Sequence, residues 1–316
     1  MEAIGGYFSL ELSLREEYHK DAIRLNTGRN CLEYILRARG YKKVYVPYYT
    51  CEVVMEPINK LDISYEFYHI DIHFEIRDRF TLKDDEALLY TNYFGLKQRY
   101  VEQLVEKFGS RLIVDNTQAF YAKPIMGIDT FYTCRKFFGV ADGAYLYTDS
   151  FLEDNFEQDK SYERMTHLLK RIDLSAEQGF ADFRKADDGL DNQPIRKMSK
   201  LTQRILQSFD YEAAAKKRRK NFQILHDALS SRNNLEFAFD EDTVPMVYPY
   251  FTKDKTLKQR LIAEKVYVAT YWPNVLKWVI EDSLEYQLAY DLLPLPIDQR
   301  YGNEEMNVIC CLINHI

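Results

Sequence analysis

Strand-like and helix-like segments alternate regularly between residues 22 and 120, and this alternation constrains the fold more than any other feature. Short runs rich in β-branched and aromatic residues predict strands, whereas amphipathic stretches of ten or more residues predict helices. The predicted strands are 22–26, 42–47, 63–70, 86–95 and 111–116. The predicted helices are 27–40, 50–60 and 97–109. Because parallel strands need long crossover connections, the pattern predicts an α/β fold with a mostly parallel sheet flanked by helices.

Local signals refine this pattern. Asn26 or Thr27 is the expected N-cap of helix 27–40, and Gly40 is its expected end. Pro57 is expected to interrupt or end helix 50–60. Two further strands are predicted at 129–133 and 143–148. The gap between them is too short for a helical crossover, so we expect one of the two to run antiparallel.

The character of the sequence changes after residue 150. Residues 161–232 are rich in charged residues, Gln and Ala, and predict helices without strands. The basic run 216–220 in this stretch is interpreted as the solvated face of a long helix. Strands are then predicted at 235–239, 246–251 and 266–272, with helices at 254–265 and 281–291. We therefore expect a large α/β domain at 1–160, which could extend through 161–232, and a small α+β domain at 235–316.

Charge and cysteine content exclude several classes of protein. The net charge of −7 over 316 residues argues against a general nucleic-acid binder. The five cysteines are odd in number and form no C-x-x-C pair, which argues against a disulfide framework or a metal site. No signal peptide and no membrane-spanning run is recognisable, so we expect no membrane partner and a cytoplasmic protein. The 15% aromatic content suits a Tyr-rich core and an interface.

The first candidate site is the turn LNTGRN at residues 25–30, where a predicted strand meets a predicted helix. Free N–H groups and the helix dipole at such a point favour a phosphate, and Arg29 could add a charged contact. A simple helix cap formed by Thr27 and Gly28 is the alternative interpretation.

The second and third candidates are an acid and a lysine, at Asp115 and Lys136. Asp115 ends an apolar strand, and Gln118 follows three residues later. A buried carboxylate needs a cation or donors beside it, although it could also cap a turn. Lys136 stands in a mostly aromatic segment, where a desolvated amine has a lowered pKa and is a candidate nucleophile. A lysine that extends to solvent is the alternative.

Together the three candidates suit pyridoxal 5'-phosphate (PLP). This cofactor needs an anchor for its phosphate, an anion beside its ring nitrogen and an amine that binds it covalently. Asp115 would keep the ring nitrogen protonated, and Lys136 would hold the cofactor and shuttle a proton. Gln118 could donate a hydrogen bond to the phenolic oxygen of the ring.

Several stretches, in order, resemble the sugar aminotransferase family of fold-type-I PLP-dependent proteins, called DegT/DnrJ/EryC1/StrS. They are LNTGRNCLEYIL, VYVPYYTCEVVMEPI, IVDNTQAF, FYTCRKFFGVADGAYL, VYVATYWP and LLPLPIDQRYGNEEMNVI. The resemblance implies a fold-type-I transferase with a small C-terminal domain, PLP or its amine form PMP as cofactor, and a homodimer. It also implies that a keto sugar and an amino-acid donor are the substrates.

The family pattern implies a role for individual residues. Lys136 and Asp115 match the catalytic lysine and acid. The implied cofactor contacts also include Gln118, the phosphate turn Thr27, Gly28 and Arg29, and the segment residues Thr133 and Arg135. Cys51 stands where many members have an aromatic residue against the cofactor ring, and Thr133 stands near a position where many have Ser. Tyr271 and Trp272 fall where the C-terminal domain approaches the substrate.

The resemblance favours an aminotransferase that moves an amino group from glutamate or a similar donor to a nucleotide-linked keto sugar, for a surface polysaccharide or another glycan. Two alternatives stay open. A PLP-dependent dehydratase or eliminase is one, although relatives that dehydrate sugars tend to lack the lysine found at Lys136. The other is a catalytically silent binding protein on the same fold.

Overall fold

The computed structural model describes residues 4–314, which form a seven-stranded sheet, a two-stranded sheet and the helices around them. The strands of the large sheet are β1 (Ile23–Leu25), β2 (Lys43–Pro47), β3 (Ser64–Tyr68), β4 (Glu86–Thr91), β5 (Leu112–Asp115), β6 (Asp129–Thr133) and β7 (Ala144–Tyr147). Their order across the sheet is β1-β7-β6-β5-β4-β2-β3. Strands β2 to β6 are parallel to one another, whereas β7 is antiparallel to both β6 and β1. The predicted mixed sheet, with one reversed strand, is confirmed.

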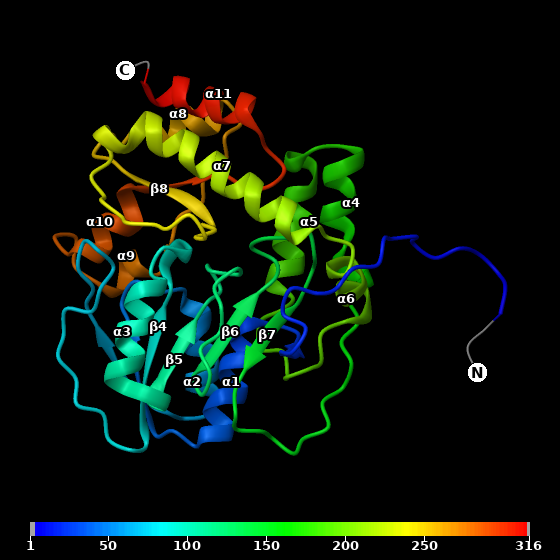
Figure 1. Ribbon diagram of the computed structural model, residues 1–316, viewed down its shortest axis with the longest axis vertical. Coiled ribbons are helices and arrows are strands. Elements are labelled where there is room, and N and C mark those ends of the chain that lie inside the picture. Colours follow the sequence, from blue (N-terminus) through cyan, green and yellow to red (C-terminus); the bar gives the residue numbers. More distant parts are fainter. Residues whose placement is uncertain (1–3, 315–316) are drawn as a thin grey trace.

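Helices cover both faces of this sheet because side chains alternate along each strand. Ala87 and Leu89 of β4 pack in one apolar cluster with α1 (Gly28–Arg39) and α2 (Met55–Lys60). Leu88 and Tyr90 of the same strand pack in the opposite cluster with α3 (Gln98–Phe108). Figure 1 shows α1 and α2 on one side of the strands and α3 on the other. The resulting three layers fix the carboxyl ends of β4, β5 and β6 at one edge of the sheet.

Two helix boundaries show how the sequence sets these elements. Thr27 is the N-cap of α1, where its hydroxyl accepts a hydrogen bond from the Asn30 N–H, and Gly40 ends the helix with φ of 67°. Both features agree with the prediction. Pro57 neither interrupts nor ends the next helix, because it lies in the first turn of α2, where no intrahelical donor is needed. A 3₁₀ helix, η1 (Glu52–Val54), precedes that turn.

The middle of the chain is helical, as predicted. It contains α4 (Thr166–Asp173), α5 (Ala176–Asp188), α6 (Lys200–Leu206) and α7 (Tyr211–Leu229). The short 3₁₀ segments of the chain are η2 (Tyr93–Gly95), η3 (Gly109–Arg111), η4 (Tyr162–Arg164) and η5 (Ser230–Arg232). The basic run on α7 departs from the prediction at one residue, because Arg218 is buried while Lys216, Lys217 and Lys220 are exposed.

The C-terminal part contains β8 (Val247–Phe251), α8 (Leu257–Ala263), α9 (Val275–Trp278), α10 (Leu284–Asp291), β9 (Leu292–Pro296) and α11 (Asn303–Asn314). Strands β8 and β9 form an antiparallel pair. A separate apolar cluster joins this pair to α7, α8 and α11, and Figure 1 shows these elements gathered at one end of the molecule. The domain limits given above stay a prediction.

Two of the predicted C-terminal strands are wrong. Residues 235–239 and 266–272 are irregular. Phe237 and Phe239 instead pack against the Phe222 ring of α7. This packing explains why apolar and polar residues alternate over 235–239 although the segment pairs with no strand. Within residues 4–314, no helix is both long and apolar enough to cross a bilayer.

Candidate functional site

Lys136 lies in a turn just beyond the end of β6. The N–H groups of Phe137 and Phe138 both donate to the Cys134 carbonyl, which closes the turn around the lysine. The Lys136 Nζ donates to the Thr117 Oγ1 at 3.1 Å. Burial among the surrounding protein atoms lowers the pKa of Lys136, and the Asp115 carboxylate is the largest opposing cause. Because the side chain is still exposed to water, solvent moderates that shift.

Asp115 is the last residue of the neighbouring strand, β5, and is 4% exposed. Its Oδ1 accepts a hydrogen bond from the Thr117 N–H at 2.8 Å. Burial raises the pKa of Asp115, and the Lys136 charge is the largest cause that lowers it. The two groups therefore interact electrostatically, yet no ion pair within 4.0 Å joins them in the part of the chain that the structure describes.

Thr117 connects the three sequence candidates. Its hydroxyl accepts from Lys136, and its N–H donates to Asp115. Its methyl group faces Gly28, where an added Cβ would come within 3.2 Å of the Thr117 Cγ2. Sequence reasoning missed this residue, although its position between Asp115 and Gln118 was a usable signal. The turn, the acid and the lysine thus meet at one edge of the sheet.

The N-terminus of α1 presents backbone donors at this edge. The first N–H groups of a helix have no intrahelical partners, and the helix dipole makes that end positive. Thr27 is buried and uses its hydroxyl as the cap, as described above. Gly28, the first helical residue, lies close to Thr117 and Phe131, and an added Cβ would come within 3.2 Å of the Thr117 Cγ2 and 3.7 Å of the Phe131 ring. A phosphate group suits such a point.

Both candidate arginines have carboxylate partners. The Arg29 Nη1 lies 2.6 Å from the Glu56 Oε2 and 2.5 Å from the Asp191 Oδ1. The Arg135 Nη1 lies 2.5 Å from the Asp187 Oδ1. The Glu56 Oε1 also accepts from the Asn192 N–H, which fixes the loop after α5 against α2. An anion reaching either guanidinium would share it with these carboxylates.

Gln118 carries an unused donor. It is fully buried, and its Oε1 accepts from the Phe94 N–H at 2.8 Å. Its Nε2 is buried and has no hydrogen-bond partner among residues 4–314. An unpaired buried amide is costly, so this donor suits an acceptor that a ligand would bring. Thr133 ends β6 and is buried on the face that Phe131 shares, toward α1.

Residues from the C-terminal part form the wall opposite the sheet. Trp272 packs edge-on against the Tyr49 ring at 5.2 Å between centroids. The Asn274 Nδ2 donates to the Thr50 carbonyl at 2.9 Å, which ties this segment to the residue before Cys51. Burial raises the pKa of Tyr271 to about 12, with the nearby Cys51 thiol as a second cause. Burial also raises the pKa of Cys51, although Lys136 lowers it.

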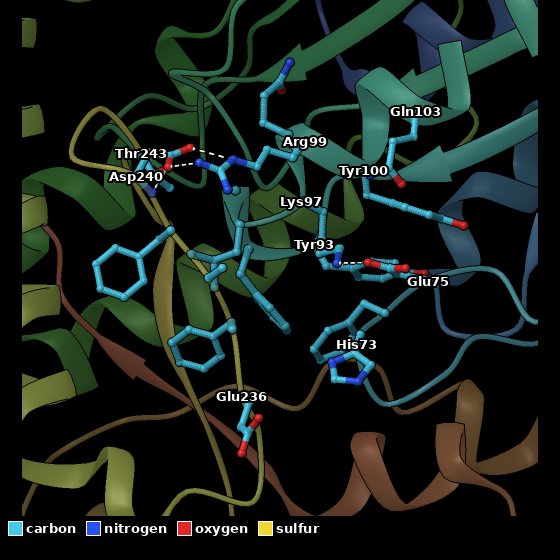
Figure 2. Close-up of a pocket in the computed structure, with 18 residues that line it drawn as sticks. His73, Glu75, Tyr93, Lys97, Arg99, Tyr100, Gln103, Glu236, Asp240 and Thr243 are labelled. Carbon is cyan, nitrogen blue, oxygen red and sulfur yellow. Dashed lines mark hydrogen bonds and ion pairs between the residues drawn. The ribbon is translucent and has the colours of Figure 1, made fainter. Parts of the chain in front are cut away.

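A cavity of about 260 Å³ lies on the far side of η2 from these residues, between α3 and residues 236–243. Figure 2 shows the ion pairs at its rim, Lys97 with Glu75 and Arg99 with Asp240. Phe94 separates the cavity from the candidate site, since it lines the cavity and its ring lies 6.3 Å from that of Tyr271. None of the sequence-predicted site residues lines this cavity.

Comparison with solved structures identifies the architecture. A DegT DnrJ EryC1 StrS aminotransferase from Brucella abortus is 14% identical, with a TM-score of 0.62 over 93% of this chain and 85% of that one. The chain has the fold of these aminotransferases. The PLP form of Spr1654 from Streptococcus pneumoniae shares this fold at 13% identity, with a TM-score of 0.61 over 92% of this chain and 85% of that one.

The same fold carries a second reaction. GDP-4-keto-6-deoxymannose-3-dehydratase (ColD), a mutant with bound GDP-perosamine, is 13% identical, with a TM-score of 0.64 over 93% of this chain and 88% of that one. No family model and no curated protein matches the sequence. The predicted fold class is confirmed, and the resemblance is confirmed at the level of the aminotransferase fold.

Proposed function

We propose that the protein is a PLP-dependent aminotransferase that transfers an amino group from an amino-acid donor such as glutamate to a keto sugar. The observation that carries this proposal is the meeting of Lys136, Asp115 and the N-terminus of α1 around Thr117. The likeness of fold to a PLP form and to a sugar aminotransferase supports it.

The residues present fit PLP. The first N–H groups of α1 would hold the phosphate, and Gly28 lets this end of the helix approach Thr117 closely. The unpaired Gln118 Nε2 would donate to the phenolic oxygen of the ring. Thr27, Thr133, Arg29 and Arg135 are the proposed further phosphate contacts, and Cys51 the proposed contact with the ring face. When bound, the cofactor supplies an electron-accepting ring and a carbon atom that carries the amino group between substrates.

Asp115 and Lys136 would divide the proton chemistry. The Asp115 carboxylate would hold a proton on the ring nitrogen, where a cation also offsets the cost of burying the acid. The Lys136 Nζ would bind the cofactor, and as a free amine would move a proton to and from substrate carbon as general acid and base. Its hydrogen bond to Thr117 keeps the amine on the side of Asp115.

The substrate side is proposed from the sequence resemblance. Tyr271 and Trp272 would contact the sugar, since their segment is tied to residues 49–51 beside the lysine. A nucleotide-linked keto sugar used for a surface polysaccharide or glycan is the proposed acceptor. The fold's dehydratase ColD, with bound GDP-perosamine, supports a sugar nucleotide. We also propose a homodimer in the cytoplasm, as the family resemblance implies.

Borohydride reduction of the protein loaded with PLP, followed by peptide mapping, tests the proposal. A pyridoxyl label on Lys136 is expected, and Lys136→Ala should abolish it. Adding glutamate to the loaded protein should convert the visible absorbance to that of PMP and release 2-oxoglutarate. A labelled protein that fails this half-reaction would favour a dehydratase or eliminase. A protein that stays colourless with PLP would favour a silent binding protein and would refute the proposal.

A further inference from the structure

Arg218 of α7 is a buried cation with an unusual set of partners. Its exposed fraction is 1%, and no carboxylate of residues 4–314 lies within ion-pair distance of it. Its Nη1 donates to the Met246 carbonyl at 3.0 Å and its Nε to the Gln299 Oε1 at 2.9 Å. Burial lowers its pKa to about 10, so it is still charged at neutral pH. Burying a guanidinium without a carboxylate partner is costly. The contact of its third nitrogen, Nη2, indicates why the charged group is kept.

That third nitrogen binds the residue next to the lysine. The Arg218 Nη2 donates to the Phe137 carbonyl at 3.4 Å, and its guanidinium lies over the Phe137 ring, 4.7 Å from the centroid. The Gln299 Nε2 donates to the same carbonyl at 2.7 Å. The peptide group between Phe137 and Phe138, one residue beyond Lys136, is therefore held by two side chains, one from α7 and one from the loop between β9 and α11.

These bonds complete an otherwise local turn. The N–H groups of Phe137 and Phe138 are satisfied within the turn, at the Cys134 carbonyl. The Phe137 carbonyl points the other way and links the turn to the C-terminal part. The position of the Lys136 amine relative to Thr117 and Asp115 depends on this backbone. A displacement of about 1 Å can cost a reacting group two orders of magnitude in rate.

We infer that Arg218 and Gln299 are positioning residues, which together clamp the Phe137 carbonyl and so aim the Lys136 amine at Thr117 and Asp115. The inferred effect is mechanical, because Arg218 bonds to the Phe137 carbonyl, whereas Asp115 is the largest of the charges that shift the pKa of Lys136. The functional consequence rests on the proposed role of Lys136, whereas the clamp itself does not.

Asn221 provides a matched control on the same helix, one turn later. Its Nδ2 donates to three carbonyls of the same β9–α11 loop, at Ile297, Asp298 and Tyr301. It is also buried, but it makes no hydrogen bond to the lysine turn. Asn221→Ala should therefore lower the melting temperature but loosen the turn around Lys136 less than the clamp variants do, because both side chains that bond to the Phe137 carbonyl are kept.

Gln299→Glu separates positioning from general support. The carboxylate can still accept from the Arg218 Nε, and the added charge strengthens that bond. It cannot donate to the Phe137 carbonyl, so the shorter arm of the clamp is lost. Arg218→Met removes the other arm while keeping an apolar chain of similar length. We expect Gln299→Glu to keep its melting temperature even if Arg218→Met does not.

The first measurement is hydrogen exchange of the backbone amides in a peptide covering 134–140, in the full-length protein without cofactor. Gln299→Glu and Arg218→Met should each speed this exchange by about tenfold, the effect of losing one buried hydrogen bond. Their combined effect should be less than the product of the two, because both act on one carbonyl. Asn221→Ala should speed the exchange of this peptide less than either clamp variant.

The second measurement is the rate at which PLP and borohydride label Lys136, which should fall further in the clamp variants than in Asn221→Ala. Unchanged exchange in Gln299→Glu, or equal exchange changes in Asn221→Ala, would overturn the inference. So would normal labelling of Lys136 in variants whose turn has loosened. If no protein takes the label but the exchange pattern holds, the clamp stands and the proposed function fails.

Discussion

His19 should make folding stability depend on pH in a way that the structure specifies. The ring is 1% exposed, and its Nε2 lies 2.7 Å from the Phe120 carbonyl. A carbonyl only accepts, so Nε2 carries the proton. Nδ1 then accepts from the Tyr147 hydroxyl at 3.1 Å. Both nitrogens of the neutral ring are satisfied, and a second proton would break the bond to Tyr147.

Burial lowers the pKa of His19 to about 4, and hydrogen bonding to Phe120 opposes this only in part. In the unfolded chain the pKa is about 6.5. As the pH falls below that value, the unfolded chain takes up a proton that the folded protein does not, so stability decreases toward pH 4. Linkage with these two values gives a loss of about 2 kcal/mol in unfolding free energy between pH 7 and pH 5.

Urea unfolding at pH 7, 6 and 5, followed by near-ultraviolet circular dichroism, measures this loss. The control is His19→Gln, whose amide can still donate to the Phe120 carbonyl but does not titrate. Other titrating groups affect both proteins equally, so the difference between their slopes isolates His19. Parallel loss of stability in the two proteins would refute the assignment of a neutral buried ring.

Two further substitutions test the frame of the site. Gly28→Leu should weaken PLP binding at least about tenfold while the fold persists, because its Cβ would crowd the Thr117 methyl group at 3.2 Å and its larger side chain would obstruct the proposed phosphate site. Spectral titration against Gly139→Ala, whose added Cβ would meet only Leu168 at 3.8 Å, provides the comparison. Arg39→Ala should cost about 3 kcal/mol in urea unfolding, since it leaves the fully buried Asp129 carboxylate without its two-pronged partner. A cost below about 1 kcal/mol would show that water reaches Asp129.

The large sheet could be predicted from the sequence because its signals are local. The N-cap Thr27 and the terminal Gly40 indicated the ends of α1. The alternation of strands and helices between residues 22 and 120 indicated a parallel sheet covered by helices. The reversal of β7 followed from the shortness of the connection after β6. These features depend on residues close together in the chain.

Features that depend on distant partners could not be predicted. Strand β9 contains Pro294 and Pro296, which argue against a strand, yet it pairs only with β8 and so tolerates residues without N–H groups. Apolar and polar residues alternate over 235–239 as in a strand, but the segment packs against helix α7. Asp191 and Asp187, which pair with Arg29 and Arg135, lie far along the chain from them. Arg218 is buried where the β9–α11 loop and the lysine turn meet α7.

The position of β1 has a consequence for how the molecule assembles. This strand lies at the sheet edge and pairs with β7, about 120 residues later in the chain. A nascent polypeptide that ends before residue 144 has no partner for β1, although α1 follows it directly. The contact of β1 that helps to fix the N-terminus of α1 can therefore form only after β7 has been synthesised, so this part of the proposed site is completed late in folding.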